Sequence, residues 1–188
     1  MRWVWKMPGI IFNDDRTKLL QKMKARNLNG NPFRDIKSFL KAHEQATRAD
    51  EHEKLAEKQR TAKMNAETKK TVEMQMRKSL RCTLKAMENY ERALNRLPDE
   101  KIVKDSSLEF AKNTILKLGQ APRTDFCNFE HGMVAHALLT ALKLYRGIEK
   151  SYPEGYDQEK VGGLEKEAAV FMEKQGEKKL WREKYAEK

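Results

Sequence analysis

The chain has no glycine and no proline between Phe33 and Leu97, a run of sixty-five residues that lies between Pro32 and Pro98. The run is filled with Glu, Lys, Arg, Ala, Gln and Met, which favour helix, and it lacks the two residues that most strongly interrupt one. A continuous helix over 33–97 would be about 98 Å long. A compact globule of 188 residues is only about 32 Å across. We therefore predict a helical rod, continuous or broken, that reaches beyond the rest of the chain.

Several kinds of chemistry have no signature in this sequence. The two cysteines, Cys82 and Cys127, form no disulfide framework and no paired zinc pattern. The nine glycines form no phosphate-binding loop. On one helix Cys127 and His131 would share a face, but His136 would point elsewhere, so the three do not form a metal site. We therefore predict no catalytic, cofactor-binding or metal-binding residue, and a protein that is not an enzyme.

No run approaches the roughly 20 apolar residues that a membrane span requires. Hydrophobic residues make up 39% of the chain and charged residues 36%, whereas average globular chains are about 45–50% apolar and about 25% charged. Such a chain can build a modest core, but not around its whole length. We expect a subunit whose missing core is supplied by neighbouring subunits.

The positive charge is concentrated at the N-terminus. The formal net charge is +11, and residues 1–43 carry ten Lys and Arg against three Asp, or +7. A concentrated basic segment suggests an anionic partner, which would be RNA, anionic lipid or an acidic protein surface. Aromatic rings accompany these cations, and rings either stack on bases or fill protein pockets. The predicted partner-binding residues of this N-terminal arm are Arg2, Trp3, Trp5, Lys6, Arg16, Lys18, Lys22, Lys24 and Arg26.

The middle of the long run has almost no large apolar side chains. Between Glu44 and Thr71 only Leu55 and Met64 are large and apolar, and thirteen residues are charged. We expect this section either to cross solvent as a single helix between anchored ends or to fray when the protein is isolated. From Val72 to Leu97 apolar residues return at steps of three and four, which predicts an amphipathic helix that packs against other elements.

Three further helices are predicted after residue 97. The first has capping-box spacing from Ser106 to Glu109, which places its start at Ser106. The second, roughly Phe126 to Lys150, is the most apolar and should lie at the centre of the body. The third begins near Asp157. The predicted fold is all-α, with an extended basic aromatic arm over 1–32, a long charged helix over 33–75, a small helical bundle over 76–175 and a charged tail over 176–188.

Two short fragments resemble known families. Ala86, Tyr90, Ala93 and Pro98 are spaced as in the second helix of a tetratricopeptide repeat, which implies one helical hairpin and no array, since the first-helix positions do not match. The tripeptide 144–146, Leu-Tyr-Arg, resembles that of the LYR family, small helical mitochondrial proteins that bind acyl carrier protein and serve respiratory complexes. In this chain it lies near the end instead of the start, so the resemblance implies a mitochondrial location and no more.

Together these features predict a non-enzymatic accessory subunit that bridges its neighbours with the long helix. The assembly we favour is a mitochondrial energy-transducing complex, either respiratory chain or ATP synthase. The alternative is a ribonucleoprotein subunit, as in a mitochondrial ribosome, with the N-terminal basic segment on RNA. A coiled-coil or cytoskeletal rod is third, and a cytoplasmic location is the alternative to the mitochondrion.

Overall fold

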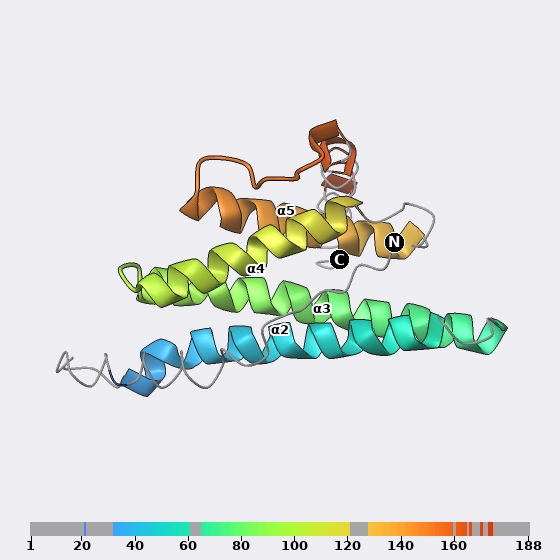
Figure 1. The fold of residues 1–188 in the computed structure, drawn as a ribbon, viewed down its shortest axis with the longest axis horizontal. Coiled ribbons are helices and arrows are strands. Elements are labelled where there is room, and N and C mark those ends of the chain that lie inside the picture. The colour runs from blue at the N-terminus through green and yellow to red at the C-terminus, as the bar shows by residue number, and fades with distance from the viewer. Residues whose placement is uncertain are drawn as a thin grey trace, which may run out of the picture.

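The computed structural model describes residues 32–60, 65–120, 128–159 and 161–164, together with positions 21, 166, 170, 173 and 174. Four long helices make up most of this part, namely α2 (Pro32–Arg60), α3 (Ala66–Arg96), α4 (Lys101–Gln120) and α5 (Asn128–Ile148) (Figure 1). All regular elements among these residues are helical, so the all-α prediction is confirmed. Within the same residues no helix is both long and apolar enough to cross a bilayer. The predicted tail over 176–188 lies outside the described residues.

The long glycine- and proline-free run forms two helices that pack side by side. Helices α2 and α3 are antiparallel, because Phe39 of α2 lies against Tyr90 of α3 while His52 of α2 meets Gln75. The prediction of a single rod through solvent is therefore wrong. The end of the hairpin that holds residues near 60 and 66 projects beyond α4 and α5 (Figure 1).

Small side chains explain why the hairpin closes where the sequence shows no apolar stripe. Four alanines of α2 are buried against the rest of the protein, namely Ala42, Ala46, Ala49 and Ala56, with exposures of 0, 7, 6 and 1%. Their spacing of three, four and seven residues places them on one face of the helix. Alanine brings neighbouring backbones close together and has the highest helix propensity. The section that lacks large apolar residues thus buries a seam of small ones.

Helix α3 begins at a conventional N-cap. The side chain of Asn65 accepts a hydrogen bond of 2.7 Å from the backbone N–H of Thr68, and its carbonyl accepts one of 3.0 Å from the N–H of Lys69. Asparagine at this position satisfies an N–H group that the first turn of a helix leaves without a partner. At the other end, the N–H of Leu97 bonds to the carbonyl of Ala93 at 2.8 Å, and Pro98 follows.

Helix α4 starts five residues earlier than the capping-box spacing predicts. It begins at Lys101, where the carbonyl of Glu100 accepts from the N–H groups of Val103 and Lys104. Ser107, predicted to lie in the first turn, is fully buried inside the helix and donates a 2.6 Å hydrogen bond to the Val103 carbonyl. The spacing was misleading because Ser106, the predicted cap, lies inside a helix that has already begun at Lys101.

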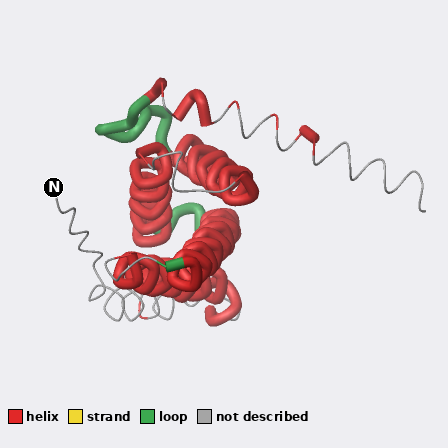
Figure 2. Tube along the Cα trace, turned by 90° about the vertical axis from the view of Figure 1, so that its right-hand side faces the viewer, coloured by secondary structure: helices red, strands yellow, loops and turns green. Residues whose placement is uncertain are grey.

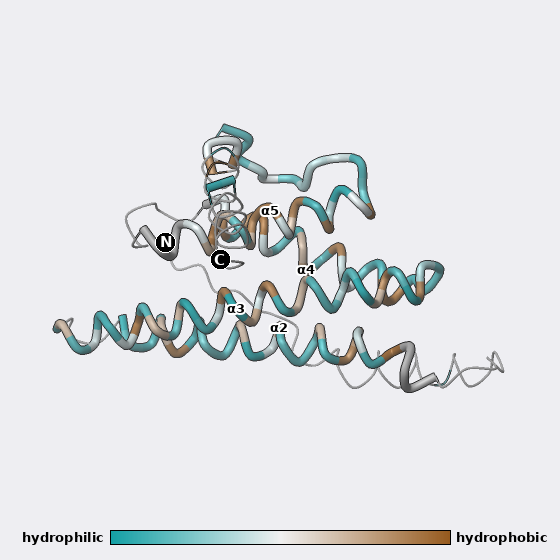
Figure 3. The backbone as a smooth tube through the Cα atoms, turned by 180° about the vertical axis from the view of Figure 1, so that it is seen from behind, coloured by the Kyte–Doolittle hydropathy of each residue, from teal (hydrophilic) through white to brown (hydrophobic). Residues whose placement is uncertain are grey.

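Helix α5 is the most apolar helix and is deeply buried, but it is not the centre that the sequence predicts, because α3 is the helix that packs against α2, α4 and α5. Ala137, Leu138 and Ala141 are fully buried, and brown, apolar residues are concentrated in this helix while teal covers much of the hairpin (Figure 3). The four helices surround a common core when seen end-on (Figure 2). The core includes Ile36 and Phe39 of α2, so α2 contributes directly to the bundle.

Candidate functional site

The predicted partner-binding arm lies outside the described residues. None of its nine predicted contact residues, from Arg2 to Arg26, belongs to the part of the chain that the structure describes. Their role therefore stays a prediction. The next cations in the described chain lie on α2, where Arg34 is in the first turn and Lys37 and Lys41 are exposed.

The most strongly charged surface of the described helices is the outer face of α3. Between Lys69 and Met87 every exposed residue other than Met74 is Lys or Arg. With Arg92, these cations recur on one side of the helix over about 33 Å from Lys70 to Arg92, and the exposed Glu88 lies on the same side between Lys85 and Arg92. We call the following five exposed residues the basic ridge of α3: Lys70, Lys78, Arg81, Lys85 and Arg92.

The basic ridge has very little compensating charge. Within the described residues, four of its members make no ion pair, and Arg92 is 3.9 Å from Glu88 with both side chains more than half exposed. Lys78, Arg81 and Lys85 are three and four residues apart, and like charges at that spacing destabilise a helix by about 0.2–0.5 kcal/mol per pair. The repulsion among the ridge cations therefore destabilises the helix slightly, and an anionic partner would relieve it.

The outer face of α2 shows what a balanced surface looks like in the same hairpin. There the exposed cations alternate with the exposed carboxylates of Glu44, Glu51 and Glu57. Arg48 lies 2.6 Å from Glu44, four residues earlier. Such pairs make α2 a solvated face whose charges satisfy one another, whereas within the described residues Lys70, Lys78, Arg81 and Lys85 of α3 make no ion pair.

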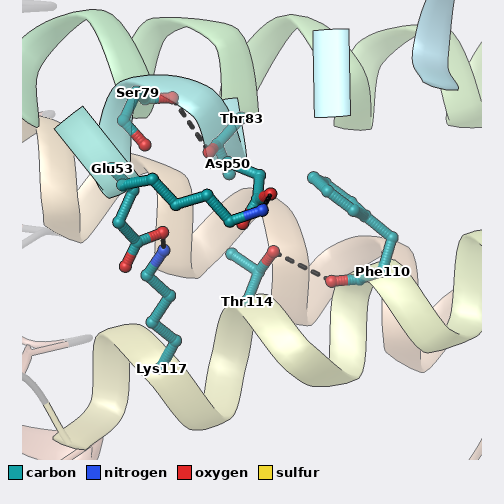
Figure 4. A network of polar contacts seen from close by, with 8 residues as sticks. Asp50, Glu53, Ser79, Thr83, Phe110, Thr114 and Lys117 are labelled. Atoms are coloured by element: carbon teal, nitrogen blue, oxygen red, sulfur yellow. Dashed lines mark hydrogen bonds and ion pairs between the residues drawn. The ribbon is translucent and has the colours of Figure 1, made fainter. Parts of the chain in front are cut away.

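A cavity of about 280 Å³ lies between α2, α3 and α4. Lys117 of α4 enters it and pairs with Glu53 of α2, while Lys54 reaches Asp50 at 2.5 Å (Figure 4). Burial lowers the pKa of Lys117 to about 8, and the charge of Asp50 opposes that shift. The walls combine alanines with polar groups such as Thr114. The Thr114 hydroxyl donates a hydrogen bond of 2.9 Å to the Phe110 carbonyl (Figure 4).

The ionisable groups of this cavity are matched to one another. Glu53 and Lys117 neutralise each other across the gap between α2 and α4, and their side chains are 32 and 39% exposed. An ion pair with that exposure contributes at most about 1 kcal/mol. The arrangement closes the space between three helices and holds α4 against the hairpin.

One histidine is half-buried between α2 and α3. The Nδ1 atom of His43 lies 3.3 Å from the Tyr90 hydroxyl, and its ring packs edge-on against Phe39 at 4.4 Å between centroids. Burial lowers the pKa of His43 to about 4, so the ring is neutral at physiological pH. This cluster is part of the core, and its polar contact fixes how α2 and α3 are aligned along their length.

Metal ligands do not assemble in the described residues, where no group of three His, Cys, Asp or Glu side chains could hold an ion. Of the three residues considered from the sequence, His136 is half-buried between α3 and α5, and the side chains of Cys127 and His131 lie outside the described part. In comparisons with known proteins, the sequence matches no protein-family model, no curated protein and no solved structure.

Proposed function

We propose that the chain is a non-enzymatic accessory subunit of a larger assembly and that it meets an anionic neighbour through the basic ridge of α3. The observation that carries this proposal is the row of exposed cations from Lys70 to Lys85 without an exposed carboxylate among them. A surface of one sign attracts and orients a partner of the opposite sign. The ridge lies on the straight, well-packed helix α3, which presents its charges in fixed order.

The hairpin that would bridge neighbours is shorter than the continuous helix that the sequence suggests. Folded into a hairpin, the 31 residues of α3 extend about 46 Å. The projecting end of the hairpin can still contact a neighbour that the bundle does not reach. As the identity of the assembly, a mitochondrial energy-transducing complex remains the first proposal on the grounds of composition. A ribonucleoprotein is the second candidate, and the basic ridge is the observation that favours it.

Charge reversal on the ridge tests the proposal. The variant with Lys78→Glu, Arg81→Glu and Lys85→Glu should fold, because all three side chains are exposed, and should be lost from the native assembly on size-exclusion or gradient fractionation. The matched control is Lys37→Glu, Lys41→Glu and Arg48→Glu on α2, which makes the same change of charge. The control variant should remain in the assembly. Equal incorporation of the two variants would refute the proposal.

A further inference from the structure

We propose that the basic ridge of α3 binds the phosphates of a single-stranded nucleic acid. This inference rests on the proposed function, since it names the anionic partner of the same surface. Three properties of the ridge carry it: from Lys70 to Lys85 the cations form a strip within about 80° of the helix circumference, the strip is straight, and its borders are not apolar. Each property favours one class of partner over another.

The width of the ridge distinguishes a strand from a membrane surface. By helical spacing, Glu73 and Glu91 both lie about 60° to one side of Lys70, and both are partly exposed. A plane of anionic headgroups laid on the ridge would approach these carboxylates as well. A strand of phosphates can follow the cations from Lys70 to Lys85 and avoid these carboxylates, whereas beyond Lys85 the exposed Glu88 lies on the line itself. Helices that lie in a membrane interface also carry a large apolar face, whereas the only exposed large apolar residue beside the ridge is Met74.

The composition of the ridge argues against a protein neighbour. The centre of a protein–protein interface is depleted of charged residues, lysine in particular, and enriched in aromatic residues and methionine. Three of the five ridge residues are lysines and none is aromatic. Contacts to nucleic-acid backbones use mainly Lys and Arg with phosphate oxygens, and they are sequence-independent.

The straightness of the ridge favours a single strand over a duplex. The cations stay on one side of α3 for about 33 Å. The phosphates of a duplex wind around its axis, so a straight row of cations meets them only where it crosses each strand. A single strand adapts its path to a positively charged track. With no aromatic side chain for base stacking, the ridge should bind without marked sequence preference.

The experiment measures the salt dependence of binding by the full chain to a labelled 20-nucleotide oligo(U) RNA, using fluorescence anisotropy. For single strands the slope of log K against log salt is about −0.7 per neutralised phosphate. Replacing Lys78, Arg81 and Lys85 with Gln should therefore reduce the slope by about 2. The loss of affinity between 50 and 200 mM salt should become about 18-fold smaller than in the wild type.

The control replaces Lys37, Lys41 and Arg48 of α2 with Gln, which changes the net charge equally, and should leave the slope unchanged within about 0.5. A second comparison replaces the arm residues Arg16, Lys18, Lys22 and Lys24 with Gln. The inference is overturned if the slope of log K against log salt changes only in the arm variant. It is also overturned if the slope changes equally in the α2 and α3 variants. Circular dichroism of each variant confirms that the helices are intact.

Parallel titrations with a 20-base-pair RNA duplex and with phosphatidylserine vesicles separate the other partners. Tighter binding to duplex or vesicles than to oligo(U), with the same dependence on the ridge, overturns the single-strand inference. If the Gln variant binds all three probes as the wild type does, yet the Glu variant of the ridge is lost from the native assembly, the partner is an acidic protein. In that case this inference fails and the proposed function stands.

Discussion

Adjacent residues near the projecting end of the hairpin allow a direct test of how α2 packs. Ala56 is 1% exposed, whereas Leu55 beside it is 46% exposed. Replacing Ala56 with Leu adds three heavy atoms to a seam that has no room for them. Overpacking of this kind costs about 1–3 kcal/mol. For a protein of this size 1 kcal/mol corresponds to about 2–4 °C, so the melting temperature should fall by roughly 2–12 °C.

The control is Leu55→Ala, which removes the same atoms from the neighbouring position. Because Leu55 is on the surface, we expect a change of at most about 0.5 kcal/mol. Thermal unfolding followed by circular dichroism at 222 nm measures both variants against the wild type. If this section were a solvated single helix, the two positions would respond alike. Equal melting temperatures for Ala56→Leu and Leu55→Ala would refute the hairpin packing described here.

Three further predictions concern the core and the cavity. The folded-state pKa of His43, about 4, lies below its unfolded value of 6.5, so the unfolded chain binds more protons between these two pH values. The free energy of unfolding, measured with urea, should therefore fall by up to about 3 kcal/mol as the pH drops from 6.5 to 4. The His43→Leu variant should lack this pH-dependent loss. A Cβ on Gly119 would lie 2.6 Å from Cγ2 of Val161, so Gly119→Ala should destabilise the fold less in a Val161→Ala background. A double-mutant cycle should show a coupling free energy of at least about 0.5 kcal/mol between the two positions. Additive effects would contradict that contact. Lys117→Met should raise the unfolding free energy at pH 7, because the lowered pKa of Lys117, about 8, shows that folding disfavours its charged form. The same variant should abolish the rise in stability that the wild type shows as the pH increases from 8 toward 10.5.

The sequence predicted the helical class and the buried apolar face of α5 because both depend on patterns of large apolar residues. Val134, Leu138 and Leu142 recur every four residues and are all buried. Such a pattern is readable without knowledge of the partner helices. The same reasoning failed over 44–71, because the buried face there consists of alanines, which occur just as often on exposed helix surfaces.

Only one residue in the sequence, Asn65, indicates that a new helix starts between α2 and α3. Asn65 stands three residues before Thr68, and its side chain caps the new helix through the N–H of that threonine. Asparagine is also common inside charged helices, so the residue alone does not mark a turn. The start of α4 was misplaced for the opposite reason, since Ser106 and Glu109 match a cap although the helix is already under way at Lys101.

The basic ridge was hidden from the sequence by a near balance of charge. Residues 72–101 carry seven Lys and Arg against five Asp and Glu, which suggests no patch. On the helix the exposed cations gather on one side together with Glu88, while Glu73 and Glu91 lie at its border and Glu91 faces Lys143 at 3.2 Å. A net charge averages over faces, and only the position of each residue around the helix separates them.

The most direct test of the account is photo-crosslinking from the ridge in intact source cells. A photoreactive amino acid is placed at position 81 on the ridge or at position 48 on α2, both of which carry an exposed arginine in the wild type. The account predicts that position 81 crosslinks to nucleic acid, seen as a nuclease-sensitive labelled band, and that position 48 does not. Crosslinks from position 81 to protein alone, or equal nucleic-acid labelling from both positions, would contradict it.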